Sequence, residues 1–281
     1  MTILVTGSVG KTSIRLASLL KSGNIPYIIA TRRDSIPNHP ATKFDWLDES
    51  TWANPFKDAT ISAAYLVPPD NVEPAPIVNK FIDYAISNGA HKFVFLGGSS
   101  TQKGGMYVGT VWSHLEEIGA QFAFLRPTWF MENFSESQHW RSIKEESQFY
   151  TAAEDGKIPF VSADDISEAA FCFLTGKKEF ENRDYMILGP ALLSHDEIAV
   201  ILSNVLGRPI RHVRKSQEEM VEHYTKLGIT PLFANFLSAL ETYARAGSEA
   251  SFENSLEAII GRRGVSFKEW ASEQAKKGTW A

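Results

Sequence analysis

Short apolar runs alternate with helical apolar stripes along the first half of the chain. The runs that predict strands are rich in β-branched and aromatic residues and lie at residues 2–5, 26–31, 61–67, 92–96 and 122–125. Apolar residues at three- and four-residue spacing predict helices between them, most clearly over residues 77–86. Strand and helix recur at intervals of about thirty residues, as in βαβ units. This pattern predicts an α/β fold with a doubly wound parallel sheet.

The pattern changes after residue 150, where short helices are expected. Three serines stand three residues before a glutamate, the spacing of a helix capping box: Ser194, Ser216 and Ser266. Strands near Phe160 and Met186 are expected to extend the sheet of the first half. We therefore predict a Rossmann-like domain over residues 1–150 and a smaller, mostly helical lobe over residues 151–281.

A glycine turn links the first strand to the first helix. Gly7 lets the chain turn tightly, and Gly10 lets backbone N–H groups approach a pyrophosphate at the positive end of the helix. The spacing Gly7-x-x-Gly10-x-x-Ser13 matches a dinucleotide-binding fingerprint in which small Ser13 replaces the third glycine. A triphosphate-binding loop ending in Gly10-Lys11-Thr12 is excluded, because it needs a glycine where Val5 stands. An ordinary βα turn is the competing interpretation.

The second strand ends in Arg32 and Arg33, where an NAD-dependent enzyme carries an acidic residue for the ribose 2′-hydroxyl. A guanidinium instead suits a 2′-phosphate, which it holds with two hydrogen bonds. The pair therefore favours NADPH/NADP+ as the cofactor, with Lys11 as a helper. Two alternatives stay open, since both arginines can be solvated surface residues and Asp34 can take the acidic role.

A short third strand is expected at residues 44–48, leading into a helix that starts at Glu49. Two carboxylates lie within this stretch. Asp45 is placed to hydrogen-bond the adenine of the dinucleotide, whereas Asp48 is placed to cap the helix.

Further cofactor contacts are expected where the parallel strands end, because ligands bind at the carboxyl edge of such a sheet. The loops after the fourth, fifth and sixth strands supply these residues. With the glycine turn and the second strand, the expected cofactor-binding residues are Thr6, Gly7, Val9, Gly10, Lys11, Thr12, Arg32, Asp45, Val67, Pro68, Pro69, Ser99 and Pro127.

Composition narrows the class of protein. The net charge is −5 without a large Lys/Arg cluster, which argues against nucleic acid as a partner. The one cysteine, Cys172, lies in an apolar helical stretch and is expected to be buried rather than nucleophilic. His195, His212 and His223 lack metal-ligand spacing, so we expect no metal site and assign them surface or capping positions. No apolar run is as long as a membrane helix and a strand begins at residue 2, so we expect a soluble, cytoplasmic protein without a signal peptide.

Several stretches of the chain resemble the NmrA-like branch of the atypical short-chain dehydrogenases. They are the TG-x-x-G start at Thr6, the run from Arg126 to Phe134, the helix start at Asp164, and the stretch from Ser194 to Pro209. Within that branch, the Gly-Lys-Thr turn is similar to the start of the fungal festuclavine and agroclavine dehydrogenases of ergot alkaloid synthesis. The resemblance covers nearly the whole chain. It implies a Rossmann-like fold, NADPH as cofactor and a small-molecule alkaloid as substrate.

The catalytic pair of most short-chain dehydrogenases is missing. Enzymes of this class that reduce ketones use a Tyr, with a Lys four residues later, to give a proton to the developing alkoxide. Tyr107 is followed at that distance by Val111, and no other residue between 100 and 120 restores the pair. The phenol of Tyr107 is therefore expected to keep an ordinary pKa of about 10. A carbonyl reduction would lack its usual acid.

Two functions are compatible with this loss. A cyclic iminium is already cationic, so hydride addition gives a neutral amine without a proton, and the ergot resemblance implies this reaction. An aromatic pocket that tolerates a cation would then be formed by Tyr107, Trp129 and Phe130, together with Trp112. Each of these residues is equally compatible with a place in the hydrophobic core. The alternative is a non-catalytic regulatory protein of the NmrA type that senses NADP(H).

Overall fold

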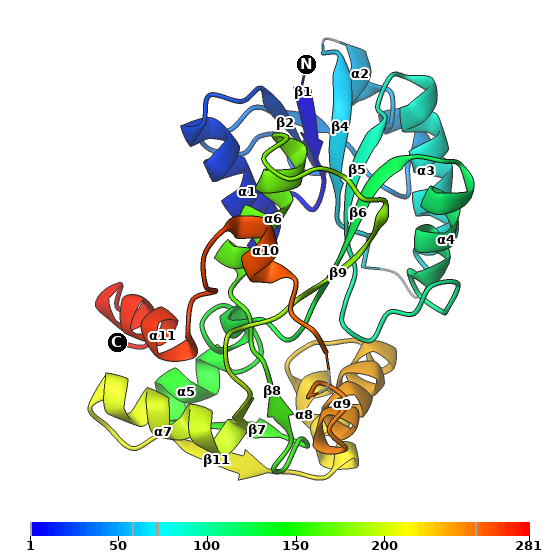
Figure 1. Cartoon of the computed structure of the whole chain (residues 1–281). Coiled ribbons are helices and arrows are strands. Elements are labelled where there is room, and N and C mark those ends of the chain that lie inside the picture. The colour runs from blue at the N-terminus through cyan, green and yellow to red at the C-terminus, as the bar shows by residue number, and fades with distance from the viewer. Residues whose placement is uncertain (1, 58, 71–72, 251) are drawn as a thin grey trace. The chain divides into compact units, whose positions relative to one another are not determined.

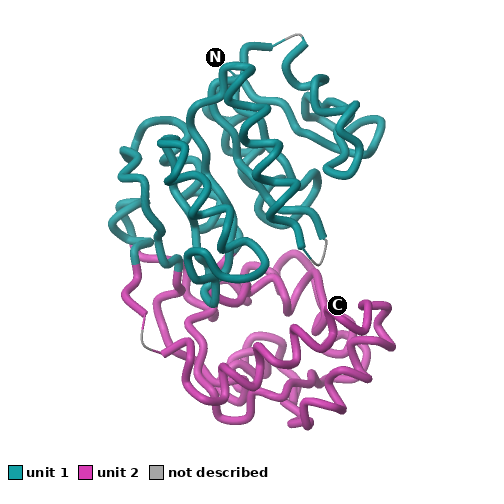
Figure 2. Tube along the Cα trace, turned by 90° about the vertical axis from the view of Figure 1, so that its right-hand side faces the viewer, with its two compact units in different colours: residues 1–127, 163–187, 255–262 teal, residues 128–162, 188–254, 263–281 magenta. Residues whose placement is uncertain are grey.

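The computed structural model describes residues 2–57, 59–70, 73–250 and 252–281, which divide into two compact units (Figure 2). Unit 1 comprises residues 1–127, 163–187 and 255–262, and unit 2 comprises residues 128–162, 188–254 and 263–281. This division differs from the single boundary expected at residue 150, because two later segments of the chain return to unit 1.

A seven-stranded sheet forms the centre of unit 1, and all neighbouring strands in it are parallel (Figure 1). In spatial order the strands are β3 (Ala41–Lys43), β2 (Tyr27–Thr31), β1 (Thr2–Val5), β4 (Ile61–Leu66), β5 (Lys92–Leu96), β6 (Gln121–Pro127) and β9 (Arg183–Ile187). The order reverses between β1 and β4, the switch point beside which doubly wound folds bind ligands. The predicted doubly wound sheet is confirmed, as is the strand expected near Met186.

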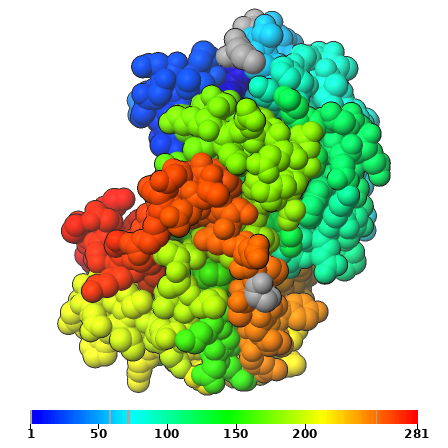
Figure 3. Space-filling model, viewed as in Figure 1, coloured from blue at the N-terminus to red at the C-terminus, as the bar shows by residue number. Residues whose placement is uncertain are grey.

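Helices cover both faces of this sheet (Figure 1). On one face α1 (Lys11–Ser22) packs against α6 (Ala163–Leu174), and on the other α3 (Ala75–Ser87) packs against α4 (Gly109–Glu117). The apolar stripe of α1 is fully buried at Leu16, Ala17 and Leu20, which accounts for its helical spacing. The shorter helices of unit 1 are η1 (Glu49–Thr51), α2 (Asn54–Lys57) and α10 (Leu256–Ile260), the last of which lies against α6 at the surface (Figure 3).

The third strand lies earlier in the chain than predicted. β3 ends before the expected stretch, and the following residues form a turn in which Asp48 N donates to Asp45 O at 3.2 Å. Phe44 and Trp46 are buried and meet Phe81 of α3 edge to face, each with ring centroids 5.1 Å apart. Phe44 and Trp46 are therefore apolar because their rings are buried against a helix. The interpretation of this stretch as a strand was wrong.

Unit 2 is mostly helical. Its helices are η2 (Met131–Phe134), α5 (Trp140–Glu146), α7 (His195–Leu206), α8 (Gln217–Lys226), α9 (Pro231–Arg245) and α11 (Phe267–Lys276). Strands β7 (Gln148–Thr151) and β11 (Arg211–Arg214) form a parallel pair beside them. The three predicted capping boxes are confirmed at the starts of α7, α8 and α11. Each supplies partners to backbone groups that a helix start would otherwise leave unpaired.

The strand expected near Phe160 does not extend the large sheet. Strand β8 (Lys157–Ile158) pairs antiparallel with β10 (Leu193–Ser194) in unit 2. Pro159 follows at once and has no N–H to continue a ladder, although its carbonyl accepts a hydrogen bond from Gly189 N at 2.8 Å. The prediction was therefore wrong for this segment.

The expectations drawn from composition can be compared with the fold. Cys172 of α6 is buried, as predicted. His195 is only 2% exposed and lies against Phe160, so its assignment to the surface was wrong, and burial lowers its pKa to about 3. Over the described ranges, the structure contains no helix with the length and hydropathy of a membrane span, and no cluster of three or more potential metal ligands.

Candidate cofactor site

The chain leaves β1 through a turn that requires glycine at two positions. Gly7 has φ +83°, and a Cβ there would lie 2.5 Å from Ser13 Oγ and 2.9 Å from Val67 Cβ. A Cβ on Gly10 would lie 2.9 Å from Gly7 O, the atom to which Gly10 N donates at 2.8 Å. Both contacts are closer than real side chains allow, so the turn is compact because it carries no side chain at either position. This is the backbone shape that a pyrophosphate needs for close approach.

The residues around this turn bind it to the sheet. Ser13 Oγ donates to Thr6 O at 2.7 Å, so the serine in place of the third glycine fastens α1 to the end of β1. Thr6 Oγ1 accepts from Val67 N at 2.7 Å, joining β1 to the loop after β4. Tyr65 OH donates to Thr12 Oγ1 at 2.9 Å. Three of the expected cofactor residues, Thr6, Thr12 and Val67, therefore take part in these hydrogen bonds.

Helix α1 presents its N-terminus at the same place. The N-cap is Gly10, which has no side chain to satisfy the first N–H groups, and the first turn of the helix carries no acidic residue. Val9 and Gly10 are exposed at the tip of the turn. An uncapped helix start with its partial positive charge suits a phosphate group. The described residues of this turn therefore fit a dinucleotide.

The end of β2 is tied to the glycine turn. Ser8 Oγ and Thr31 Oγ1 lie 2.8 Å apart, and Thr31 Oγ1 also accepts from Arg33 N at 3.0 Å. Lys43 Nζ of β3 donates to Arg32 O at 2.6 Å. These bonds hold the backbone of both arginines while their side chains remain exposed. Sequence reasoning did not include Ser8 and Lys43, because only the fold brings β3 and the turn beside the end of β2.

The carboxylates after β3 serve the local backbone. Asp45 Oδ1 accepts from Leu47 N at 3.0 Å, and Asp48 Oδ1 accepts from Ser50 N at 3.1 Å. The predicted capping of a helix by Asp48 is thus confirmed at η1. A contact between Asp45 and adenine stays a prediction.

The remaining expected contacts lie in the loops after β4 and β5 and at Pro127, the last residue of β6. Val67, Pro68 and Pro69 follow β4 directly. Ser99 N donates to Pro127 O at 2.9 Å, which places the loop after β5 beside the end of β6. Gly97 makes that approach tight, since a Cβ there would lie 2.4 Å from the ring of Phe124. These residues therefore lie where the parallel strands end, which is the edge at which such sheets bind ligands.

Tyr107 differs from its expected setting. Helix α4 begins at Gly109, and Tyr107, two residues before it, has a left-handed φ of +64°. A Cβ on Gly109 would lie 2.2 Å from Gln102 O, so the preceding loop folds closely onto the helix start. Partial burial of the phenol and the Asp70 carboxylate raise the pKa of Tyr107, which corrects the expectation of an ordinary value. The phenol is a weaker acid than predicted.

The predicted aromatic residues belong to both units. Trp112 of unit 1 stacks on Phe124 with ring centroids 5.3 Å apart. Trp129 and Phe130 belong to unit 2 and are partly buried, with Trp129 O accepting from Val161 N at 3.0 Å. The catalytic roles assigned to Tyr107, Trp129 and Phe130 stay predictions.

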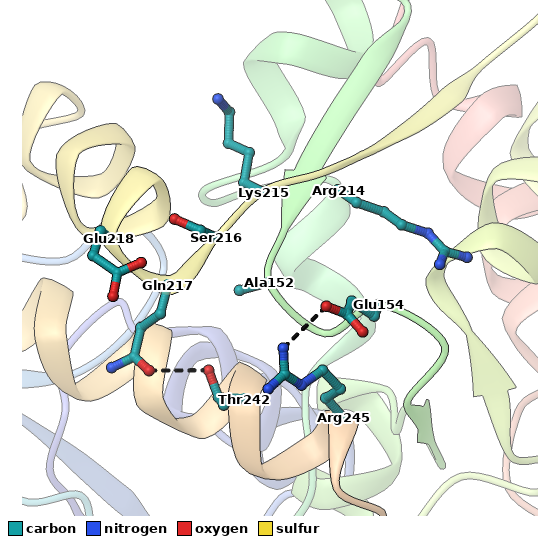
Figure 4. A pocket seen from close by; sticks show the side chains of 9 residues that line it. All are labelled: Ala152, Glu154, Arg214, Lys215, Ser216, Gln217, Glu218, Thr242 and Arg245. Atoms are coloured by element: carbon teal, nitrogen blue, oxygen red, sulfur yellow. Dashed lines mark hydrogen bonds and ion pairs between the residues drawn. The ribbon is translucent and has the colours of Figure 1, made fainter.

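A separate cavity of about 580 Å³ lies in unit 2 (Figure 4). Three of its charged lining residues, Glu154, Arg214 and Arg245, form ion pairs. Arg245 donates to Glu154 at 3.0 Å, and Arg214 lies 2.6 Å from Asp155 and 2.5 Å from Asp196. None of the predicted site residues lines this cavity.

A parallel sheet with this strand order and a glycine turn after β1 defines the Rossmann-like class of dinucleotide-binding folds. Solved structures agree with this class. Triphenylmethane reductase of Citrobacter sp., complexed with NADP(H), is similar with a TM-score of 0.80 and 20% identity, over 98% of this chain and 100% of that one. The quinone oxidoreductase QOR2 of Escherichia coli, complexed with NADPH, has a TM-score of 0.80 and 20% identity, over 97% and 99% of the two chains. At such identities the likeness shows the fold.

Sequence relatives identify the family. Festuclavine dehydrogenase of Aspergillus fumigatus is 39% identical over 292 aligned positions, covering 100% of this chain and 99% of that protein. Agroclavine dehydrogenase of Claviceps fusiformis is 37% identical over 100% and 99% of the two chains, and festuclavine synthase II of Penicillium roqueforti is 40% identical over both chains in full. No protein-family model matches the chain. The protein belongs to the family of festuclavine and agroclavine dehydrogenases, which confirms the resemblance found in the sequence.

Proposed function

We propose that the protein is an NADPH-dependent reductase that transfers hydride to a cyclic iminium of a clavine-type indole alkaloid. The observation that carries this proposal is the sequence identity of 37 to 40% to festuclavine and agroclavine enzymes over the full chain. We expect the enzyme to be cytoplasmic and to act on a small molecule without a metal, membrane or nucleic-acid partner.

The residues of unit 1 fit NADPH. The glycine turn and the start of α1 would hold the pyrophosphate, and Arg32, whose backbone Lys43 fixes, would hold the 2′-phosphate with help from Arg33 and Lys11. The loops that contain Pro68, Ser99 and Pro127 would border the nicotinamide end. The complexes of two similarly folded reductases with NADP(H) or NADPH support this assignment. When bound, NADPH supplies the hydride.

The chain itself then has to orient the substrate and exclude water. A cationic iminium accepts hydride without a proton, so a phenol with a raised pKa is no obstacle to the reaction. We propose that Tyr107, Trp129 and Phe130 contact the substrate, because aromatic faces attract a cation at short range. Correct placement of the two reactants would supply most of the rate enhancement.

The test is oxidation of NADPH by the purified protein with a panel of cyclic iminium compounds. We expect turnover with a polycyclic indole iminium and none with the matching saturated amine. NADPH binding, followed by its fluorescence, is measured in parallel. Binding without any turnover would favour the NADP(H)-sensing alternative, and absence of binding would contradict both functions.

A further inference from the structure

The guanidinium of Arg126 joins three elements of unit 1 at the carboxyl edge of the sheet. Arg126 is near the end of β6, and its side chain is only 15% exposed. Its Nη1 donates to Asp184 Oδ2 of β9 at 2.7 Å, and its Nη2 donates to Ser99 O at 2.6 Å. The arginine thus connects the neighbouring strand β9 to the loop after β5.

A third contact orients the guanidinium plane. The Cζ atom of Arg126 lies 5.7 Å from the ring centroid of Trp112 in α4. Trp112 is itself stacked on Phe124, which lies two residues before Arg126 on the same face of β6. The ring supports the guanidinium while two of its nitrogens make directed hydrogen bonds.

The loop held by this arginine is also fixed through its backbone, since Gly97 N donates to Leu125 O at 2.8 Å and Thr101 N donates to Gly98 O at 3.0 Å. Ser99 N bonds to Pro127 O, so the loop continues the β5–β6 ladder for only a few residues beyond β5. The Ser99 side chain is buried, and its carbonyl is the acceptor that Arg126 satisfies. Removal of the guanidinium would leave a poorly exposed carbonyl and carboxylate without this donor, which costs more than the bond itself contributes.

We propose that Arg126 is a positioning residue, which holds the Ser99 loop in the conformation that accepts the nicotinamide end of the cofactor. The inference rests on the proposed function, because it requires that unit 1 binds NADPH through this loop. Arg126 acts through Ser99 and does not itself touch the cofactor. Its role depends on the planar fork, which bonds Asp184 and Ser99 at once, and lysine cannot reproduce this geometry.

The test compares Arg126→Lys with Arg183→Lys. Arg183 begins β9 beside Asp184, lies 2.8 Å from Glu181 and stacks on Tyr185, so its replacement disturbs an ion pair on the strand that Arg126 contacts but leaves the bond from Arg126 to Ser99 O in place. We measure the NADPH dissociation constant, kcat and KM for the iminium, and hydrogen exchange of the amides of residues 97–101, all well below the unfolding temperature.

For Arg126→Lys we expect faster exchange at residues 97–101 and a loss of about tenfold in NADPH affinity or in kcat, with KM for the iminium changed less than twofold. Arg183→Lys should match the wild type in NADPH affinity, kcat, KM and hydrogen exchange. Equal behaviour of the two variants, or faster exchange spread over the whole of unit 1, would show that Arg126 serves stability alone and would overturn the proposal.

A second variant covers the case in which Arg126→Lys does not fold. Asp184→Asn leaves the bond from Arg126 to Ser99 O in place but weakens the bond from Arg126 to residue 184. We therefore expect hydrogen exchange at the same amides to increase less than in Arg126→Lys. An unchanged loop in Asp184→Asn would contradict the inference. If wild-type protein bound no NADPH, the proposed function would fail first and the inference with it, whereas binding by the wild type with unaltered variants would remove only the inference.

Discussion

At the scale of single residues, the candidate site depends on the few positions where backbone geometry leaves no choice. Gly7 and Gly10 lack room for a Cβ, and Ser13 uses its hydroxyl to bond β1 where the fingerprint has a third glycine. Arg32 is different, because its backbone is fixed by Lys43 while its guanidinium is exposed. The proposed role of Arg32 in binding the 2′-phosphate therefore depends on the charge of its guanidinium, which a substitution tests directly.

Arg32→Ala should weaken NADPH binding much more than NADH binding. Loss of a charge-assisted hydrogen bond to the 2′-phosphate costs about 2 kcal/mol, or roughly thirtyfold in the dissociation constant. Fluorescence titration with both cofactors measures the effect, and Arg33→Ala, at the helper position, should show a smaller loss of NADPH affinity. Equal losses for NADPH and NADH would show that Arg32 does not recognise the 2′-phosphate.

Tyr107→Phe should reduce kcat by at most about tenfold, equivalent to roughly 1.4 kcal/mol, if the substrate is an iminium. The raised pKa of the phenol makes it a poor proton donor at neutral pH, so its removal costs orientation rather than acid catalysis. Steady-state turnover with a permanently charged N-alkyl iminium provides the measurement. A thousandfold loss would identify Tyr107 as a general acid and would favour a carbonyl substrate.

At the scale of elements, unit 2 contains a buried carboxyl group that joins two helices to a strand end. Glu241 of α9 accepts a hydrogen bond from Tyr224 OH of α8 and one from Ala152 N, just after β7, at 2.8 Å. Burial raises the pKa of Glu241 to about 7. The α8–α9 hairpin is therefore more stable when this carboxyl group is protonated.

The free energy of unfolding should respond to pH through Glu241. The pKa of Glu241 is higher in the folded than in the unfolded chain, so protonated Glu241 contributes its full stabilisation of the folded state below about pH 4.5. This stabilisation is lost as pH rises through 7, at up to about 1.4 kcal/mol per pH unit. Glu241→Gln should remove this loss and become more stable relative to the wild type at pH 8 than at pH 5. Urea unfolding at both pH values measures it, with Glu222→Gln on the exposed side of α8 as control. A difference between variant and wild type that does not change with pH would contradict this.

At the scale of the whole molecule, all the expected cofactor residues belong to unit 1, whereas Trp129 and Phe130 belong to unit 2. The chain passes between the units several times, and the second half of the sequence contributes α6, β9 and α10 to unit 1. A ligand that binds unit 1 therefore stabilises segments from distant parts of the sequence.

NADPH should raise the thermal unfolding midpoint. At a hundred times its dissociation constant a ligand adds about 2.7 kcal/mol, which corresponds to roughly 5 to 10 °C for a chain of this size. Calorimetry measures the midpoint with and without NADPH, and Gly10→Val should lose the shift because its side chain closes the turn. If the units unfold in separate transitions, only that of unit 1 should move, and a shift confined to unit 2 would place the cofactor elsewhere.

The local pattern of the sequence determined the elements whose signals lie within a few residues. β1, the glycine turn and α1 follow from apolar spacing and two glycines, and the capping boxes of α7, α8 and α11 follow from a serine and a glutamate three residues apart. The buried strand β4, which is apolar at every position except Ser62, indicated a parallel sheet for the same reason. These features depend on short-range geometry, which one stretch of chain specifies by itself.

Only the tertiary structure decided what depends on distant partners. Phe44 and Trp46 alternate as in a strand but are buried against Phe81, and His195 is enclosed among aromatic rings from other elements. Arg126 meets an acceptor 58 residues away in Asp184, which no local pattern could indicate. The physical reason is the same in each case: burial and hydrogen-bond pairing are settled by which elements the fold brings together, and the sequence alone does not display those neighbours.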